Sequence, residues 1–385
     1  MLLRLVFKNL QRHKLRLSLT ILGIAIAVMA FGLIRTVITS WNAGVDASDN
    51  KRVITRHAVS FIFPLPLSYR DRILKIPGVS NITYANWFGG TYLDAKNFFP
   101  RMAIDPETFF ALYPEYIPDD QSMLETMKHT RNGCMIGKKI AEQFKLKIGD
   151  NMRVIGDIYP GDWDFTVVGI YHGRDKKSDE TQMLFNWTYL DETLKQNSPV
   201  RAGRVGWYVL EVKDAARIAA VSEAIDKEFA NSDAETKTET ERAFQQSFVS
   251  MSGAIISLIS IVSYVIIGII FLVLANTMIM TARERTREYA VLKTIGFTGR
   301  HLATIIAGEA ILVALIGGGV GLLITFPICA GFASAFSMFF PIFVVEPMTI
   351  TMALTAALGA GVFGALVPLS RAIRTPIVNG LRQLS

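Results

Sequence analysis

The side chains between Arg283 and His301 have the types and the spacing that suit the docking of a partner protein. Charge is dense at the start of this segment, with five charged residues in six positions: Arg283, Glu284, Arg285, Arg287 and Glu288. An apolar set follows: Tyr289, Val291, Leu292 and Ile295. Charges of both signs beside an apolar set favour binding to another protein over a bond-making reaction.

The elements around this segment must hold it at a membrane surface. An uncharged run long enough to cross a bilayer lies on each side of it. Gly296 tolerates a left-handed backbone, which is the usual way to end a helix, and Thr298 can cap the helix that starts next. We therefore predict a short amphipathic helix between two membrane spans, placed to receive force from a soluble partner.

The segment resembles the cytoplasmic loop of ABC transporter permeases of the MacB/FtsX/LolC type. The family pattern R-x-R-E-[ILY]-x-[IV]-L-[KR]-[AT]-[IL]-G is matched here by Arg285, Arg287, Glu288, Tyr289, Val291, Leu292, Lys293, Thr294, Ile295 and Gly296. The resemblance implies docking on a separate ATPase through Glu284, Arg285, Arg287, Glu288, Tyr289, Leu292, Lys293 and Gly296. The alternative is a basic loop that follows the positive-inside bias, which explains the arginines but neither the apolar half nor the glycine.

Composition indicates a membrane protein with a sizeable soluble part. The chain has 385 residues, of which 51% are hydrophobic and 19% charged. Its net charge of +7 comes from three short basic segments, 1–16, 283–301 and 371–385, so the remainder is acidic. Because a nucleic-acid-binding protein needs a basic patch on its soluble domain, this distribution argues against that class.

The uncharged runs predict a polytopic α-helical membrane protein with four transmembrane helices plus an α+β extracytoplasmic domain inserted between helices 1 and 2. The expected segments, in order, are a cytoplasmic amphipathic segment (1–16), transmembrane helix 1 (17–39), the extracytoplasmic, MacB-like domain (40–247), a stalk and transmembrane helix 2 (248–282), the cytoplasmic coupling loop (283–301), transmembrane helix 3 (302–326), an outer loop (327–348), transmembrane helix 4 (349–370) and a cytoplasmic tail (371–385). A signal peptide is the competing interpretation of the first run. Both termini are expected inside, since this places all three basic segments in the cytoplasm.

The domain between the first two spans shows mixed helix and strand signals. A strand at 59–63, a helix at 68–76 and a strand at 79–87 predict a small open sheet with helices on one face. Residues of about 110–190 are expected to form an inserted subdomain. The stretches IGKKIAEQFKLKIGDNMRV and WDFTVVGIYH are similar to the periplasmic domain of MacB-type permeases.

The second span continues the domain's last helix in our prediction. No charge occurs from Ala243 to Ala282, and we expect one unbroken helix through this stretch. Forty residues of helix would reach ~60 Å, against a hydrocarbon core of ~30 Å. The helix should therefore project beyond the bilayer as a stalk.

Glu309 and several glycines lie inside the predicted spans. A carboxylate at Glu309 needs a partner, and we expect either a simple pair with Arg283 or Arg371 or a coupling contact with the docking helix. The glycines predict close helix packing, with a gating hinge or dimer seam as the alternative. The glycines assigned to packing are Gly317, Gly321, Gly361 and Gly364.

The sequence offers no catalytic or cofactor site. The stretch from Asn132 to Lys139 comes near a phosphate loop but fails, because its glycine spacing is one short and Lys139 stands where Ser or Thr should hold magnesium. The five histidines are scattered, and the two cysteines lie in different regions, so no metal site is expected. We predict a non-catalytic subunit that binds no cofactor, with ATP and magnesium on the partner ATPase.

The resemblance implies a permease subunit in the cytoplasmic (inner) membrane, which passes ATP-driven movement of a separate ATPase to its outer domain (mechanotransmission). Efflux or the release of lipoprotein or lipid-like cargo would follow. The alternative is an FtsX-type regulator that activates an extracytoplasmic cell-wall hydrolase without transporting cargo. The expected partners are an ABC ATPase, a second copy or a paralogous permease, a periplasmic adaptor or lipoprotein, and membrane lipid, but no nucleic acid.

Overall fold

The chain forms two compact units, seen here in a computed structural model that describes residues 14–175, 178–337 and 339–374, with side chains up to residue 370. One unit holds residues 14–39, 253–334 and 343–374. The other holds residues 40–252 together with 335–342. The predicted amphipathic segment, apart from its last three residues, and most of the predicted tail lie outside the described residues.

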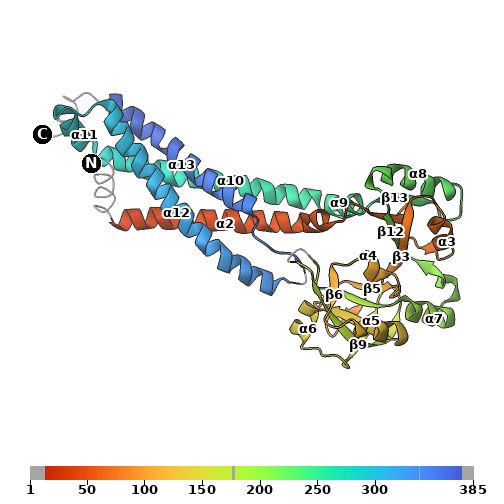
Figure 1. Ribbon diagram of the computed structural model, residues 1–385. Helices are drawn as coiled ribbons and strands as arrows, with labels where there is room; N and C mark the ends of the chain where they lie inside the picture. The colour runs from red at the N-terminus through yellow and green to blue at the C-terminus, as the bar shows by residue number, and fades with distance from the viewer. Residues whose placement is uncertain (1–13, 176–177, 338, 375–385) are drawn as a thin grey trace. The chain divides into compact units, whose positions relative to one another are not determined.

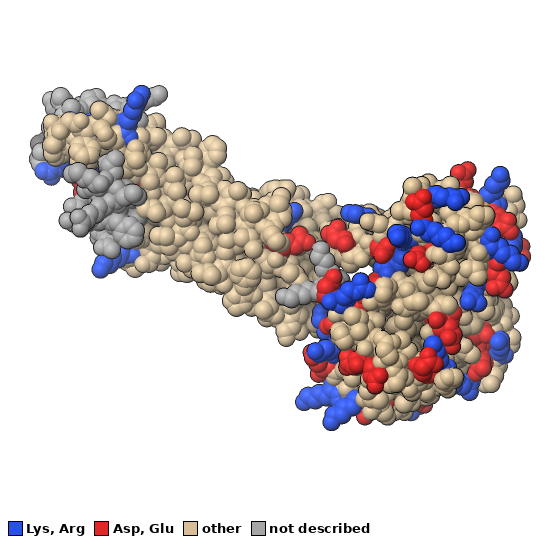
Figure 2. Space-filling model, viewed as in Figure 1, with Lys and Arg blue, Asp and Glu red and all other residues tan. Residues whose placement is uncertain are grey.

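The first unit is a bundle of long apolar helices. Among the described residues, four helices are long and apolar enough to cross a membrane, and a short helix, α11 (Thr286–Thr294), joins two of them. The long helices are α2 (Lys14–Ala47), α10 (Gly253–Glu284), α12 (Gly299–Ala335) and α13 (Pro347–Arg374). They run side by side in Figure 1, and the face seen in Figure 2 is almost bare of charged side chains along their length. Such a surface suits contact with lipid tails.

The predicted unbroken stalk helix is wrong, because the chain breaks at Ser252. Helix α9 (Glu241–Met251) ends there, where the Ser252 N–H donates to the Val249 carbonyl (3.0 Å), and α10 starts at Gly253. Glycine has a low helix propensity, and a Cβ at Gly253 would meet no atom of the described chain within 4 Å. Neither propensity nor packing therefore favours a continuous helix at this point.

The third span also differs from its prediction. Helix α12 continues through Pro327 to Ala335, whereas we expected the span to end at residue 326 and an outer loop to begin at Pro327. Proline removes one backbone hydrogen bond, but the neighbouring backbone groups would lose theirs as well if the helix stopped inside an apolar layer. Continuing the helix is the smaller cost.

The second unit is a mixed α/β domain built on one long sheet. Within the described residues the sheet has eleven strands in the order β13-β1-β12-β3-β5-β10-β7-β9-β8-β4, with β6 paired to β9. The first part comprises β1 (Arg52–His57), β3 (Val79–Trp87), β12 (Trp207–Val212) and β13 (Thr236–Thr240). The inserted part comprises β4 (Thr91–Tyr92), β5 (Arg101–Ile104), β6 (Tyr116–Pro118), β7 (Gly133–Gly137), β8 (Asn151–Gly156), β9 (Gly161–Gly173) and β10 (Met183–Asn186). A separate pair joins β2 (Leu65–Pro66) to β11 (Arg204–Val205).

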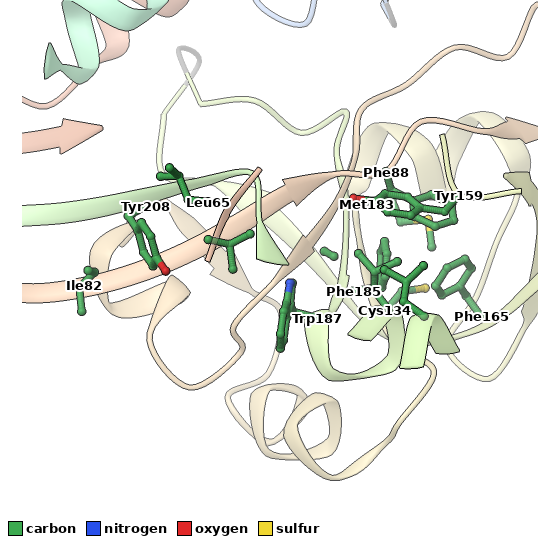
Figure 3. Close-up of a cluster of buried hydrophobic side chains, with 14 of the residues drawn as sticks. Leu65, Ile82, Phe88, Cys134, Tyr159, Phe165, Met183, Phe185, Trp187 and Tyr208 are labelled. Atoms are coloured by element: carbon green, nitrogen blue, oxygen red, sulfur yellow. The ribbon is translucent and has the colours of Figure 1, made fainter. Parts of the chain in front are cut away.

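Short helices complete this domain. They are α3 (Tyr69–Leu74), α4 (Phe109–Leu112), α5 (Ser122–His129), α6 (Lys138–Phe144), α7 (Trp187–Asn197), α8 (Ile218–Glu228) and α9, with 3-10 turns at Pro199–Arg201 and Ala215–Arg217. One apolar core serves both parts of the sheet. In Figure 3, Trp187 lies between the group around Tyr208 and the group around Phe88 and Phe185. The Trp187 indole also donates to the Asn86 side chain (2.9 Å), so the buried ring keeps a partner.

The small open sheet predicted for the first subdomain is instead part of one larger sheet, because antiparallel pairing of β3 with β5 joins both parts of the domain. The strand predicted at 59–63 is wrong. Residues 60–63 form a turn, in which the Phe63 N–H donates to the Ser60 carbonyl (3.2 Å), and two prolines, Pro64 and Pro66, follow without N–H groups. The strand lies earlier, at Arg52–His57, where β12 and β13 pair with it on both sides.

The loop between α12 and α13 contacts the α/β domain. Residues 335–342 belong to the same compact unit as that domain. The Lys139 ammonium donates to the Pro341 carbonyl, and the Trp41 ring meets the Phe340 ring edge-on at 5.8 Å. Besides the two chain connections at its ends, the domain thus has a third link to the membrane-spanning part of the sequence.

Candidate functional site

The segment between α10 and α12 is folded by local signals. Helix α10 ends at Glu284, and α11 runs from Thr286 to Thr294. After it, the Phe297 N–H donates to the Leu292 carbonyl (3.0 Å) and the Gly296 N–H to the Lys293 carbonyl (3.1 Å). These two bonds, with Gly296 at a φ of +98°, are the Schellman arrangement that ends helices. Any residue with a Cβ would be strained at Gly296.

One face of the segment points into the helix bundle. The Arg285 guanidinium donates to the Glu309 carboxylate on α12 at 2.9 Å, and both side chains are only 7% exposed. Tyr289 and Ala290 are buried, and Leu292 and Phe297 pack against the same apolar cluster. Burial, with a smaller effect of the Glu309 charge, raises the pKa of Tyr289 to about 12. These side chains fix the segment to the bundle.

The opposite face is open to solvent. Arg287 and Glu288 are exposed, as are Thr294 and two apolar side chains, Val291 (41%) and Ile295 (71%). Exposed apolar side chains beside charges are suited to a protein contact. We call the exposed face of α11, made of Arg287, Glu288, Val291, Thr294 and Ile295, the candidate docking face.

The predicted docking set divides between these two faces. Arg285 and Tyr289 lie inside, Leu292 and Lys293 are half-buried, and Glu284, Arg287, Glu288 and Gly296 are exposed. Sequence reasoning placed Val291 and Ile295 in the apolar set but not among the docking residues. Helical spacing groups Val291 with Ile295, four residues apart, and Tyr289 with Leu292, three apart, but it does not tell which of the two pairs faces the bundle.

Glu284 has a partner that sequence reasoning missed. The Arg16 guanidinium donates to both oxygens of the Glu284 carboxylate, with an Nη2 to Oε1 distance of 2.7 Å. The two residues are 268 positions apart, so the pair left no local pattern. It joins the start of α2 to the end of α10, and thus to the segment that follows.

Glu309 accepts from Arg285. Arg283 and Arg371 were examples for a simple pair with a basic residue near the inner interface, and a contact with the docking helix was the alternative. Since Arg285 opens α11, this pair forms a contact between the third span and the docking helix. Its role in coupling stays a prediction.

The glycines assigned to packing lie at helix contacts. A Cβ at Gly321 would come within 2.6 Å of the Ala25 carbonyl on α2, and one at Gly317 within 2.8 Å of Ile24. A Cβ at Gly361 would meet Ala314 on α12 at 3.1 Å, and one at Gly364 would make ordinary contact with α10 at 3.4 Å. Gly317 and Gly321 thus let α12 approach the backbone of α2.

Two family descriptions match the chain. The MacB-like periplasmic core domain matches residues 17–228, which is more than half of the chain, and the FtsX-like permease C-terminal region matches residues 260–377. The first match covers the first span and most of the α/β domain. The second covers the segment from α10 to the described end of α13.

Curated relatives agree with these matches. An uncharacterized ABC transporter permease of Methanocaldococcus jannaschii is 23% identical over 83% of this chain and 81% of that relative. An uncharacterized ABC transporter permease of Bacillus subtilis, YvrN, is 23% identical over 99% of this chain and 98% of that relative. A macrolide export ATP-binding/permease protein MacB of Nitrobacter winogradskyi is 35% identical over 34% of this chain, which spans only 19% of that protein.

A solved structure also resembles the α/β domain. The extracellular domain of the noncanonic ABC-type transporter YknZ from Gram-positive bacteria has a TM-score of 0.35 and 11% identity, over 49% of this chain and all of that one. The four membrane helices, the α/β domain between the first two and the two family matches agree with one another. The chain belongs to the MacB-like and FtsX-like family of ABC transporter permeases.

Proposed function

We propose that this chain is a permease subunit that couples ATP hydrolysis on a separate ATPase to movement of its extracytoplasmic domain. The ATPase docks on the exposed face of α11. Movement then passes through the membrane helices to the α/β domain, which acts on efflux cargo or on a lipoprotein or lipid-like cargo. The exposed face itself carries the proposal, because charges of both signs stand beside Val291 and Ile295 there.

Two ion pairs support the path from the docking face into the bundle. Arg285 joins α11 to α12 through Glu309, and Arg16 joins α2 to the end of α10 through Glu284. A push on α11 would thus be shared by three spans instead of bending a loose loop. Buried, well-oriented charge pairs hold their geometry better than exposed ones, which suits the Arg285 pair to this role.

The proposed orientation places the docking segment and both termini in the cytoplasm. The extracytoplasmic domain lies between the first and second spans, so the segment between the second and third spans falls on the other side of the membrane. Its five Lys and Arg residues agree with the positive-inside bias. A second copy or a paralogous permease completes the transporter, and ATP and magnesium bind to the ATPase.

Charge reversal on the docking face tests the proposal. The double variant Arg287→Glu/Glu288→Arg should lose co-purification with the ATPase and at least nine-tenths of the ATPase stimulation, because both contacts become repulsive. Lys227→Glu, an exposed charge reversal on α8, is the matched control and should keep both. If the double variant folds, inserts and still stimulates the ATPase like the unchanged chain, the docking face is assigned wrongly.

A regulator of the FtsX type would use the same docking face, and the FtsX-like match at residues 260–377 keeps this second candidate open. The two functions differ in what the extracytoplasmic domain binds. Cross-linking of the full chain in membranes, followed by identification of its extracytoplasmic partner, separates them. Capture of a cell-wall hydrolase favours the regulator, and capture of an adaptor or lipoprotein favours the transporter.

A further inference from the structure

A buried charge cluster lies at the base of the α/β domain, centred on Arg52 at the start of β1. The guanidinium donates through Nε to Glu241 (2.7 Å), through Nη2 and Nη1 to Glu115 (2.7 and 3.0 Å), and through Nη1 to the Leu112 carbonyl (2.9 Å). The Arg52 and Glu241 side chains are each 7% exposed and that of Glu115 is 24% exposed. The cluster therefore holds two carboxylates on one cation, mostly out of water.

Glu241 joins the two chain connections at the ends of the domain. It is the first residue of α9, which leads through Ser252 into α10. Its carboxylate also accepts the Asp49 N–H (3.0 Å), two residues beyond the end of α2. Through this one carboxylate, the chain leaving α2, the start of α9 and strand β1 are held together.

Glu115 and Leu112 extend the cluster to the inserted part of the sheet. They flank Tyr113, whose ring lies 4.4 Å from the Arg52 guanidinium. That ring stacks with Phe109 (4.6 Å) and with Tyr116 (5.8 Å), which also stack with each other (6.1 Å), and Tyr116 meets Tyr171 on β9 at 5.2 Å. Strand β9 pairs with β6, β7 and β8, so this group of rings reaches the middle of the inserted part.

The electrostatics of the cluster favour a fixed geometry. Burial opposes the charge of Arg52, but the hydrogen bond to Glu115 and the nearby Glu241 carboxylate outweigh it and raise the pKa of Arg52. Burial raises the pKa of Glu241, against the opposing effect of Arg52. Apolar residues of similar volume often stabilise a core as well as a buried ion pair does, so stability alone gives little reason for charges here.

We infer that Arg52 is a positioning residue that transmits movement of α9 and the α2 exit to the inserted part of the α/β domain, residues 91–186. The inference rests on the proposed function, in which nucleotide-driven movement reaches this domain. Arg52 touches all three groups at once: Glu241 on α9, Glu115 before β6 and the ring of Tyr113. Without it, α9 and the inserted part would still be linked by the sheet and by the apolar cluster that holds Phe244 of α9 and Leu112, but by no fixed, charge-assisted contact.

A rival path exists through the Lys139 ammonium on α6, which donates to the Pro341 carbonyl in the loop between α12 and α13. This contact could move the inserted part without Arg52. The two paths can be cut separately. Glu115→Ala weakens the Arg52 path, since it removes the two hydrogen bonds to Glu115 and leaves those to the Leu112 carbonyl and Glu241. Lys139→Met cuts the other path.

Distances measured by pulsed electron paramagnetic resonance in the full chain with its ATPase test the inference. Spin labels go on introduced cysteines at Arg300, Gln246 and Thr126, which lie at the start of α12, on α9 and on α5 and are all exposed. The native cysteines, both buried, are replaced first. The 300–246 distance reports movement that reaches α9, and the 300–126 distance reports movement that reaches the inserted part.

In the unchanged chain both distances should change between the nucleotide-free and the vanadate-trapped states. In Glu115→Ala the change at 300–246 should persist, while the change at 300–126 should fall to less than half. Arg52→Lys keeps the charge but lacks the planar guanidinium that binds both carboxylates at once. It should likewise keep the change at 300–246 and lose most of the change at 300–126. Arg56→Met, which removes a β1–β13 ion pair (2.9 Å) that does not reach residues 112–116, is the control and should leave both changes intact.

The outcomes distinguish a failure of this inference from a failure of the proposed function. If neither distance responds to nucleotide in the unchanged chain, the proposed function fails. If both respond and Glu115→Ala and Arg52→Lys behave like Arg56→Met, the assignment to Arg52 is overturned. Loss of the 300–126 change in Lys139→Met alone would overturn it in favour of the rival path.

Discussion

Two arginines are buried in this chain to the same extent, one in each compact unit, and they are held differently. The Arg285 side chain is 7% exposed and donates to the Glu309 carboxylate, which ties α11 to α12. The Arg52 side chain is also 7% exposed, and it binds two carboxylates, a carbonyl and a ring. The first contact joins two membrane-unit helices at the docking segment. The second joins β1, α9 and the segment 112–115 inside the α/β domain.

The packing of the two units differs as well. In the membrane unit, Gly317 and Gly321 let α12 come close to α2, so the contact depends on the absence of side chains. In the α/β domain, a continuous core of large side chains fills the space between sheet and helices, with Phe88, Phe165 and Phe185 fully buried. Helices with small contact surfaces can slide, whereas a core of interlocked rings resists sliding. The comparison thus suggests a bundle that shifts and a domain that follows.

Among the variants that test this comparison, Arg52→Met should have the largest effect on stability. It leaves the buried Glu241 and the half-buried Glu115 without their cation, and breaking a buried pair in this way costs about 3–5 kcal/mol. We expect the free energy of unfolding of the α/β domain to fall by that amount, measured by tryptophan fluorescence of the full chain in urea. Adding Glu241→Gln should restore part of the loss, since it removes one of the stranded charges. A loss below about 1 kcal/mol would contradict the arrangement described for Arg52.

Glu309→Gln should have a smaller effect, because the amide keeps an acceptor for Arg285. A hydrogen bond to a charged group is worth about 1.5–3 kcal/mol, and part of it survives the change. Amide hydrogen exchange in α11 should become faster while exchange in the α/β domain stays the same. Equal protection of α11 in the variant and the unchanged chain would show that the pair does not hold the docking helix.

Gly321→Ala and Gly319→Ala form a matched pair on α12. The new methyl group at Gly321 would press on the Ala25 backbone, whereas at Gly319 it would meet no described atom within 4 Å. Overpacking costs about 1–3 kcal/mol, so Gly321→Ala should lower the thermal stability of the bundle and Gly319→Ala should not. The same loss for both variants would mean that the close contact between α12 and α2 does not stabilise the bundle.

The smallest effect concerns Cys134 on β7. Burial raises the pKa of this thiol, so little reactive thiolate forms at neutral pH. A maleimide reagent should leave Cys134 unmodified in the folded chain and should label it once the domain is unfolded in urea. Fast labelling under native conditions would show that the core opens locally, which would contradict the continuous, tightly packed core described for the domain.

The sequence predicted the parts of this protein that depend on local signals. Long uncharged runs such as 17–34 predicted spans, and Gly296 predicted the end of α11. Glycines at 317 and 321 predicted close helix contacts. Each of these rests on composition or spacing within one stretch of chain, which a single sequence contains.

The remaining features depend on residues far apart in the chain. Arg52 and Glu241 are 189 positions apart, and Arg16 and Glu284 are 268 apart, so no periodic pattern in the sequence predicted either pair. The direction of each α11 side chain also depends on where the bundle lies. The sequence therefore could not tell that Tyr289 faces the bundle and Ile295 faces solvent. The passage of α12 through Pro327 reflects a solvent effect that overrides local propensity, whereas the break at Ser252 follows the low helix propensity of Gly253, a local signal that the prediction did not use.

Labelling from one side of the membrane tests the central claim, that the docking segment and the α/β domain lie on opposite sides. Ile295→Cys and Thr126→Cys place single thiols on exposed positions of α11 and α5, in a chain whose two native cysteines are replaced. A membrane-impermeant maleimide is applied to cells whose cytoplasmic membrane is intact and, separately, to lysed cells. We predict that the thiol at 126 reacts in both samples and the thiol at 295 only after lysis. Reaction at 295 in intact cells, or protection at 126 until lysis, would contradict the account.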